Sequence, residues 1–313
     1  MGLSQFNRHL IISLFFIIFL LSLASSCLAA RRLTELYQPP PLSLTYHNGP
    51  LLQGNLPVSI VWYGQFISSQ KSIIADFLLS LNPTATTPSA KPSVSQWWNL
   101  IQTYLKKAGK KDTHIFLSTQ ITDKNCSLGK ILKKSHITDL ISKVNAEPGG
   151  LTLVLTANDV AVEGFCMSNC GFHGSNSKHD SAFIWAGNSV TQCPGQCAWP
   201  FHQPIYGPQS TPLGAPNGDV GVDGMVVNIA SLLASAVTNP FGDGYYIGSG
   251  GQPMEVASAC TGVYGKGAYP GYAGELLVDS STGASYNAVG VNGRKYLLPA
   301  LFDPLTSKCS PIV

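Results

Sequence analysis

The most informative pattern of apolar and polar positions runs from Gly224 to Tyr246, where apolar residues recur at three- and four-residue steps. This spacing predicts a core-facing helix that ends at Thr238–Pro240. The opposite stripe of the helix is polar and carries Asn228, Ser231 and Ser235. Positions 231 and 235 share one face, where the helix of a zinc hydrolase carries its ligands and base, yet both are serine. The pattern therefore predicts a buried helix without a reactive group.

Elsewhere, short apolar runs alternate with helical periodicity. The first strand pair is predicted at Leu42–Tyr46 and Val58–Tyr63, joined by a loop that opens with the turn His47–Pro50. Helical patterns cover Lys71–Leu81, Ser93–Lys107 with a cap at Ser93, and Ser135–Val144; strand-like runs cover Thr113–Ile121, Leu151–Ala157, Phe183–Ala186, Glu275–Asp279 and Lys295–Leu298. Strands that alternate with helices predict an α/β or α+β fold. We expect a mixed central sheet covered by helices, followed by a Gly-rich half with antiparallel additions and long loops.

Residues 1–30 have the three regions of a secretory signal peptide: a basic start, an apolar core at Leu10–Leu23 and small residues before the cleavage site. The core holds about 14 residues, fewer than the roughly 20 that span a bilayer. We expect cleavage after Ala29 or Ala30, which leaves residues 31–313 as a single secreted domain. The alternative is a retained anchor. No second run is long enough to cross a membrane, so no membrane contact is expected after processing.

The charge balance excludes a polyanion-binding surface. The chain has 19 Lys and Arg against 16 Asp and Glu, and only 11% of its residues are charged. The dense basic cluster at Lys106–Lys111 has no interleaved aromatic residues, so we expect no nucleic-acid partner. The 31 Gly and 21 Pro are typical of a loop-rich secreted protein.

Eight cysteines become seven when Cys27 leaves with the signal peptide. The disulfide candidates are Cys126, Cys166, Cys170, Cys193, Cys197, Cys260 and Cys309. Outside the cell, disulfides are favoured over a structural zinc site. The spacing leaves the connectivity open, and one cysteine should stay free or pair with a partner. Asn125 begins a glycosylation sequon whose central Cys126 is itself a disulfide candidate.

Candidate ligand-binding residues lie in and beyond a Gly- and Cys-rich stretch from Gly164 to Trp199. They are His173, His179 and Asp180, with Glu255 further along the chain. If these side chains converge in one pocket they form a site; the alternative is a set of hydrogen-bonded loop residues. The chain has no G-x-S-x-G, H-E-x-x-H or Walker motif. We therefore expect no catalytic residue, no metal and no cofactor.

Several long sequence runs resemble the plant EXORDIUM family, also called the phosphate-induced protein family. They are Tyr46–Leu52, Val61–Gly64, Ser93–Trp98, Cys193–Phe201, Gly267–Asp279 and Asn292–Pro304. The resemblance covers nearly the whole mature chain. It implies a protein of the apoplast and cell wall that is linked to cell expansion, brassinosteroid-responsive growth and carbon status. It transfers no established reaction and no catalytic residues.

The run Ser231–Pro240, followed by Glu255 and Cys260, is similar to the active-site helix of some secreted zincin-like proteins. Serine is a poor zinc ligand, and Leu232 cannot act as a base. This resemblance implies a degenerate zincin-like scaffold that has lost its metal site. The alternative is a core helix that is similar only through its alanine and leucine content.

Three functions follow from these observations. The first is regulation of growth by binding a wall glycan or an apoplastic protein, with Trp199, Tyr269 and Tyr272 as candidates for stacking on sugar rings; packing is the alternative role of these aromatics. The second is an extracellular hydrolase with an unrecognised site. The third, a tyrosine-cross-linked structural protein, is disfavoured because the chain lacks short periodic repeats.

Overall fold

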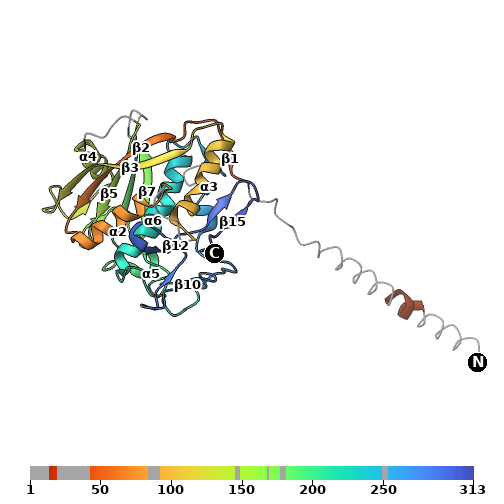
Figure 1. Cartoon of the computed structure of the whole chain (residues 1–313). Helices are drawn as coiled ribbons and strands as arrows, with labels where there is room; N and C mark the ends of the chain where they lie inside the picture. Colours follow the sequence, from red (N-terminus) through yellow and green to blue (C-terminus); the bar gives the residue numbers. More distant parts are fainter. Residues whose placement is uncertain are drawn as a thin grey trace, which may run out of the picture. The chain divides into compact units, whose positions relative to one another are not determined.

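A computed structural model describes residues 14–19, 43–83, 92–144, 149–167, 169–176, 181–248 and 253–313. The chain divides into two units, Met1–Pro41 and Leu42–Val313. In the first unit, residues 14–19 are helical and exposed. The predicted cleavage site lies outside the described residues. All of the architecture below belongs to the second unit (Figure 1).

A five-stranded mixed sheet forms the core of this unit, as the alternating pattern predicts. Its strand order is β3-β2-β5-β8-β7, with β2 (Gly54–Tyr63), β3 (Thr113–Asp123), β5 (Leu151–Thr156), β7 (Gly171–Ser175) and β8 (Ala182–Gly187). Four strands are parallel, and β7 pairs antiparallel with β8 at one edge. Every residue of β5 and β8 is buried, which explains their continuous apolar runs.

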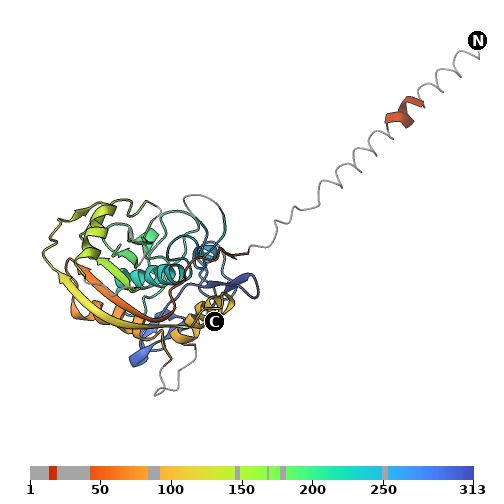
Figure 2. The same ribbon diagram turned by 90° about the horizontal axis from the view of Figure 1, so that it is seen from above.

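The helices are α2 (Ser68–Leu79), α3 (Val94–Lys107), α4 (Lys134–Ser142), the short α5 (Pro194–Cys197) and α6 (Val220–Thr238). The cap predicted for α3 is confirmed, because the Ser93 hydroxyl accepts the Gln96 N–H at 3.1 Å. The three predicted helices before the Gly-rich half are present, with ends that differ from the prediction by up to three residues. Figures 1 and 2 show α6 in the middle, with the sheet strands to one side and the blue C-terminal ribbons to the other.

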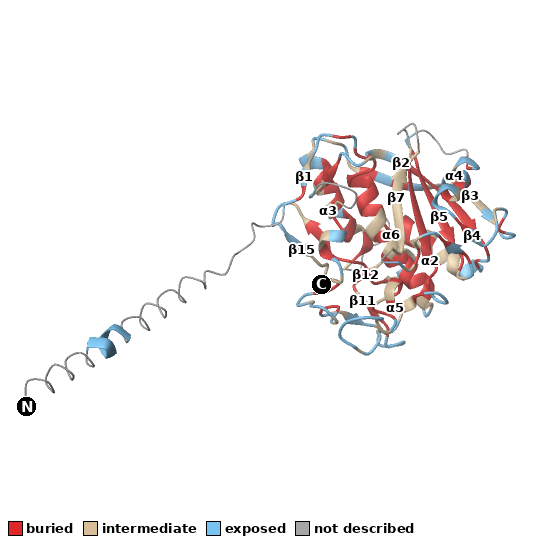
Figure 3. Cartoon of the chain, turned by 180° about the vertical axis from the view of Figure 1, so that it is seen from behind, coloured by how far each residue is buried: buried red, intermediate tan, exposed pale blue. Residues whose placement is uncertain are grey.

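Helix α6 is the predicted core helix, but it begins earlier than its apolar pattern indicates. Asp219 caps it by accepting the Val222 N–H at 3.0 Å. The helix packs on β7 and β8, and Figure 3 shows it largely in the buried colour. By length and composition α6 is apolar enough to cross a membrane, a property that the sequence analysis overlooked. Most of it is buried within the fold, as expected for the core helix of a globular domain.

The predicted pairing of Leu42–Tyr46 with Val58–Tyr63 is wrong. Strand β1 (Thr45–Tyr46) instead pairs antiparallel with β9 (Tyr245–Tyr246), near the end of α6. Both edges of β2 are already occupied by β3 and β5, which leaves no edge for β1. The connecting segment crosses to α6, where the Leu52 N–H donates to the Val237 carbonyl at 3.1 Å.

The other strands are short and form two-stranded ribbons. These are β4 (Ile131–Leu132) with β6 (Ala161–Val162), β10 (Leu277–Val278) with β11 (Ser285–Tyr286), β12 (Ala288–Val289) with β13 (Lys295–Tyr296), and β14 (Leu301–Asp303) with β15 (Lys308–Ser310); the 3₁₀ turns are η1 (Ser258–Cys260) and η2 (Val291–Gly293). The two late strands predicted from sequence are present but shortened to two residues each. Antiparallel additions and long loops in the second half are confirmed.

Three disulfides staple this half, as expected. They join Cys166 to Cys193, Cys170 to Cys197, and Cys260 to Cys309, across sequence separations of 27, 27 and 49 residues. Loops of this size correspond to about 3 to 4 kcal/mol each in the chain-entropy model. Among the described cysteines, Cys126 is the free one, and it is buried. The neighbouring Asn125 is exposed, and because Cys126 is unpaired, no disulfide engages the centre of the glycosylation sequon.

Candidate functional site

Two of the candidate binding residues meet at the edge of the sheet. His173 lies on β7 and Glu255 lies just before η1, and His173 Nε2 is 2.9 Å from Glu255 Oε2. The side chains are 16% and 12% exposed. Asn239, at the end of α6, donates from Nδ2 to Glu255 Oε1 at 2.6 Å, and Ser235 also hydrogen-bonds to this carboxylate. The cluster therefore links β7, α6 and the segment before η1.

The carboxyl group of Glu255 is held in its charged form. Burial alone would raise its pKa, but the hydrogen bond and charge of His173 and the hydrogen bonds from Asn239 and Ser235 outweigh it. The net effect is a pKa below the ordinary value for glutamate. The ionised carboxylate of Glu255 therefore connects β7, α6 and the segment before η1 through partly buried hydrogen bonds.

Two of the candidate residues cannot be compared with this cluster. His179 and Asp180 lie outside the described residues. Within the described chain, no group of three or more His, Cys, Asp or Glu side chains is placed to hold a metal ion. Ser231 donates its hydroxyl to the Val227 carbonyl in its own helix at 3.1 Å. His173 Nδ1 is buried and has no hydrogen-bond partner among the described residues.

The polar stripe of α6 has a second point of attachment at its opposite end. Asn228 donates from Nδ2 to the Cys197 carbonyl, the last residue of α5, at 2.9 Å. Helices α5 and α6 lie close together at Gly224: a Cβ added to this residue would lie 2.7 Å from the Cβ of Ala198. Asn228 and Ser235 thus hold two different loop segments against one helix. The stripe supports the surrounding loops.

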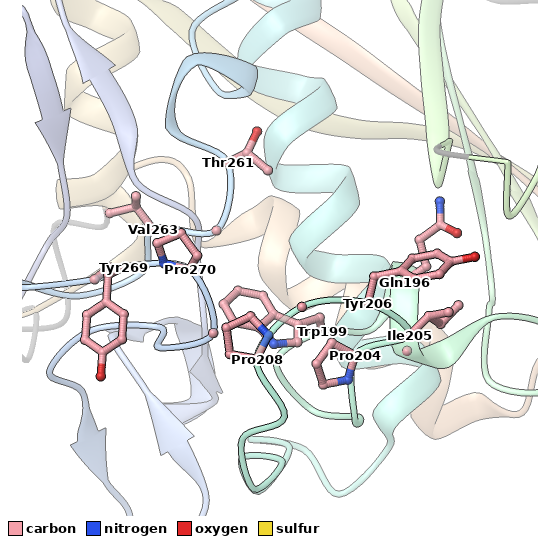
Figure 4. A pocket seen from close by; sticks show the side chains of 15 residues that line it. Gln196, Trp199, Pro204, Ile205, Tyr206, Pro208, Thr261, Val263, Tyr269 and Pro270 are labelled. Atoms are coloured by element: carbon pink, nitrogen blue, oxygen red, sulfur yellow. The ribbon is translucent and has the colours of Figure 1, made fainter.

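An open pocket of about 680 Å³ lies between two of these loop segments, residues 195–208 and residues 261–271. Its aromatic residues are Trp199, Tyr206 and Tyr269, and its polar side chains include Gln196 and Thr261. None of the described residues that line it is charged. In Figure 4, Tyr206 lies to one side of Trp199 and Tyr269 to the other. This surface combines apolar faces with a few hydrogen-bonding groups, which is common in ligand sites.

A tight turn forms one wall of the pocket. Tyr269 and Tyr272 exchange backbone hydrogen bonds at 3.1 and 2.8 Å, with Pro270 and Gly271 between them. Gly271 has φ +89°, the left-handed conformation that favours glycine after proline in such a turn. The turn brings the two tyrosine rings to 5.1 Å between centroids. It also contacts the other wall, because a Cβ on Gly271 would lie 2.6 Å from the Cβ of Pro208.

The ring of Trp199 packs against the buried side chain of Tyr264. The centroids of the two rings lie 5.6 Å apart. Asn287 donates to the Tyr264 carbonyl at 2.9 Å and to the Leu298 carbonyl at 2.7 Å. Trp199 therefore presents a half-buried ring with a supported orientation.

Disulfides anchor both walls of the pocket. Cys193 and Cys197 flank the lining residues Gly195 and Gln196, and Cys260 directly precedes Thr261. Of the stacking candidates predicted from the sequence, Trp199 and Tyr269 line the pocket, whereas Tyr272 is not among the described lining residues. The sequence analysis missed Tyr206, although an aromatic residue between Pro204 and Pro208 is a signal of a constrained loop.

Comparison with known proteins gives one consistent result. The Phosphate-induced protein 1 conserved region matches residues 44–312. Protein PHOSPHATE-INDUCED 1 of Nicotiana tabacum is 55% identical, covering 98% of this chain and 99% of the relative. Two Arabidopsis thaliana proteins are 52% identical: Protein EXORDIUM-like 2, over 89% of this chain and 92% of the relative, and Protein EXORDIUM, over 94% and 96%. No solved structure matches.

The names of these three relatives specify no reaction. The family match extends over the sheet, α6, all three disulfides and both walls of the pocket. The sequence resemblance is thereby confirmed, and the chain belongs to the phosphate-induced protein 1 family, which includes the EXORDIUM and EXORDIUM-like proteins.

Proposed function

We propose that this protein works in the apoplast as a binding protein of the plant cell wall and regulates cell expansion linked to brassinosteroid and carbon status. The predicted signal peptide and the three disulfides support an extracellular location. The observation that carries the proposal is the uncharged aromatic pocket with its two disulfide-anchored walls. Binding is favoured over catalysis because the described lining residues include no acid, base or activated nucleophile.

Expression of the full chain in plant tissue tests this function. The variant Tyr206→Ala removes a pocket side chain that is 88% exposed, so the fold should tolerate it. Phe116→Ala on β3 is the matched control, because Phe116 is 41% exposed and does not line the pocket. We expect the Tyr206 variant to lose both wall retention and its effect on cell expansion, and the control to keep both. Equal behaviour of the two variants would refute a role for the pocket.

An extracellular hydrolase is the second candidate, and the convergence of His173 and Glu255 favours it. These side chains are 82 positions apart in the sequence and still form a partly buried pair. Against it, Asn239 and Ser235 already occupy the carboxylate. Release of reducing ends or peptides by the purified protein, abolished by Glu255→Gln, would establish hydrolysis and displace the binding proposal.

A further inference from the structure

We propose that the ligand of the pocket is a segment of a neutral polysaccharide, held by stacking of sugar rings on its aromatic side chains. This inference rests on the proposed binding function and names the chemical class that the same pocket accepts. Three properties of the pocket carry it: the absence of charge, the exposure of its aromatic rings and the rigidity of its walls.

The charge of the lining selects among wall polymers. The described residues that line the pocket are aromatic, aliphatic, proline, glycine or neutral polar; Lys266 belongs to the same wall segment but is not among the lining residues. An acidic polysaccharide would bring carboxylates that need arginine or lysine partners, and a buried carboxylate without such a partner is costly. A neutral sugar carries hydroxyl groups instead, which Gln196 and Thr261 can bind from opposite walls of the pocket.

The exposure of the aromatics argues against a packing role. Tyr206 is 88% exposed and Tyr269 is 63% exposed, although each tyrosine would gain free energy by burying its ring. Both stand at a pocket whose deeper residue Trp199 is only half-buried. The C–H face of a pyranose is apolar and its rim is polar, so it matches a tyrosine or tryptophan surface of this kind. A sugar ring bound on these tyrosines would bury the apolar ring faces that are exposed in the free protein.

The walls are built to present these rings in fixed positions. The Tyr269–Tyr272 turn is closed by two backbone hydrogen bonds, Trp199 is supported by Tyr264, and the Ile205 N–H donates to the Gly195 carbonyl at 3.3 Å. A site with little left to order loses less entropy when it binds. The volume of about 680 Å³ lies within the roughly 300 to 1,000 Å³ that is usual for small-ligand sites, which suits a short oligosaccharide segment.

Calorimetric titration of the purified full chain tests the ligand class. The probes are neutral cello- and xyloglucan oligosaccharides, an oligogalacturonide of similar length as the acidic counterpart, and a proline-rich peptide, which also favours aromatic grooves. We expect binding of a neutral oligosaccharide that does not change between low and high salt. Tyr206→Ala should weaken it about tenfold, as expected for the loss of one aromatic stacking contact, and Phe116→Ala should not change it.

Three results would overturn this inference: salt-dependent binding of the oligogalacturonide alone, binding of the peptide alone, or neutral-sugar binding that Tyr206→Ala leaves unchanged. Failure of every glycan probe would overturn it as well. The proposed function is judged separately, because wall retention that depends on Tyr206 would persist with a ligand of another class. If the protein binds no glycan probe and its wall retention does not depend on Tyr206, both proposals are refuted.

Discussion

The sheet region, residues 54–187, and the loop region, residues 193–310, are held together in different ways. In the sheet region, the central strands β2, β5 and β8 have six or more residues and bury nearly all of them, and β5 and β8 are fully covered. In the loop region, strands have two or three residues, and every disulfide has at least one cysteine there. Short ribbons gain little stability by themselves. Regular burial thus fixes the fold, whereas covalent links and side-chain hydrogen bonds fix the candidate site.

The largest loss of stability should come from removing the disulfide with the greatest sequence separation, Cys260–Cys309. We expect Cys260→Ser with Cys309→Ser to lower the free energy of unfolding by about 4 kcal/mol, because the bridge closes a 49-residue separation. Ligand binding should weaken along with it, since Cys260 borders the pocket wall. Urea unfolding monitored by circular dichroism measures the first effect and titration measures the second. A variant with unchanged unfolding would show that the loop region does not depend on this bridge.

Truncating a core side chain in the sheet region should lower stability without weakening ligand binding, unlike removal of the disulfide. Ile184→Ala on β8 empties a fully buried site and should cost about 3 kcal/mol. Because Ile184 is not among the described residues that line the pocket, the folded variant should bind ligand normally. Unfolding curves combined with titration at low temperature measure both effects. Weak binding by the fully folded variant would mean that the two regions are coupled more tightly than the contrast allows.

The Glu255 cluster joins the sheet region to the loop region. Its contribution to the free energy of unfolding should therefore depend on pH. The pKa of Glu255 is lower in the folded protein than in the unfolded chain, so its stabilisation is present above about pH 4.3, the ordinary glutamate value. It is lost as the pH falls through the folded pKa. Glu255→Gln should therefore cost about 2 kcal/mol at pH 6 and progressively less toward pH 3. Melting temperatures of both proteins across this range give the comparison, and a constant difference would contradict the account.

The smallest effect on stability is expected in the pocket itself. Tyr206→Ala should change the free energy of unfolding by less than about 0.5 kcal/mol, because the side chain is 88% exposed. Chemical denaturation measures this change beside the Phe116→Ala control. A loss of several kcal/mol would show that Tyr206 is a packing residue after all.

The same contrast explains what the sequence could predict. Helix α3 with its Ser93 cap and strand β5 follow from local periodicity, and the structure confirms them. The partner of β1 could not be predicted, because it depends on both edges of β2 being filled. The apolar pattern places the start of α6 too late, because that start depends on the Asp219 cap and two of the first five helix residues are glycines.

The candidate site depends on contacts between distant residues, so the sequence revealed only its parts. His173 and Glu255 were named as candidates, but their pairing requires the end of α6 to approach β7. The aromatic residues of the pocket come from two loops that meet at Gly271 and Pro208. Disulfide connectivity stayed open for the same reason, because equal four-residue spacings in two cysteine pairs allow several pairings.

Hydrogen–deuterium exchange of the purified full chain, with and without a neutral oligosaccharide, distinguishes the pocket from the sheet edge as the ligand site. The account predicts new protection confined to the two pocket walls, residues 195–208 and 261–271, with exchange in β5 and β8 unchanged. Protection around His173 and Glu255 in place of the walls would contradict it and move the functional site to the edge of the sheet.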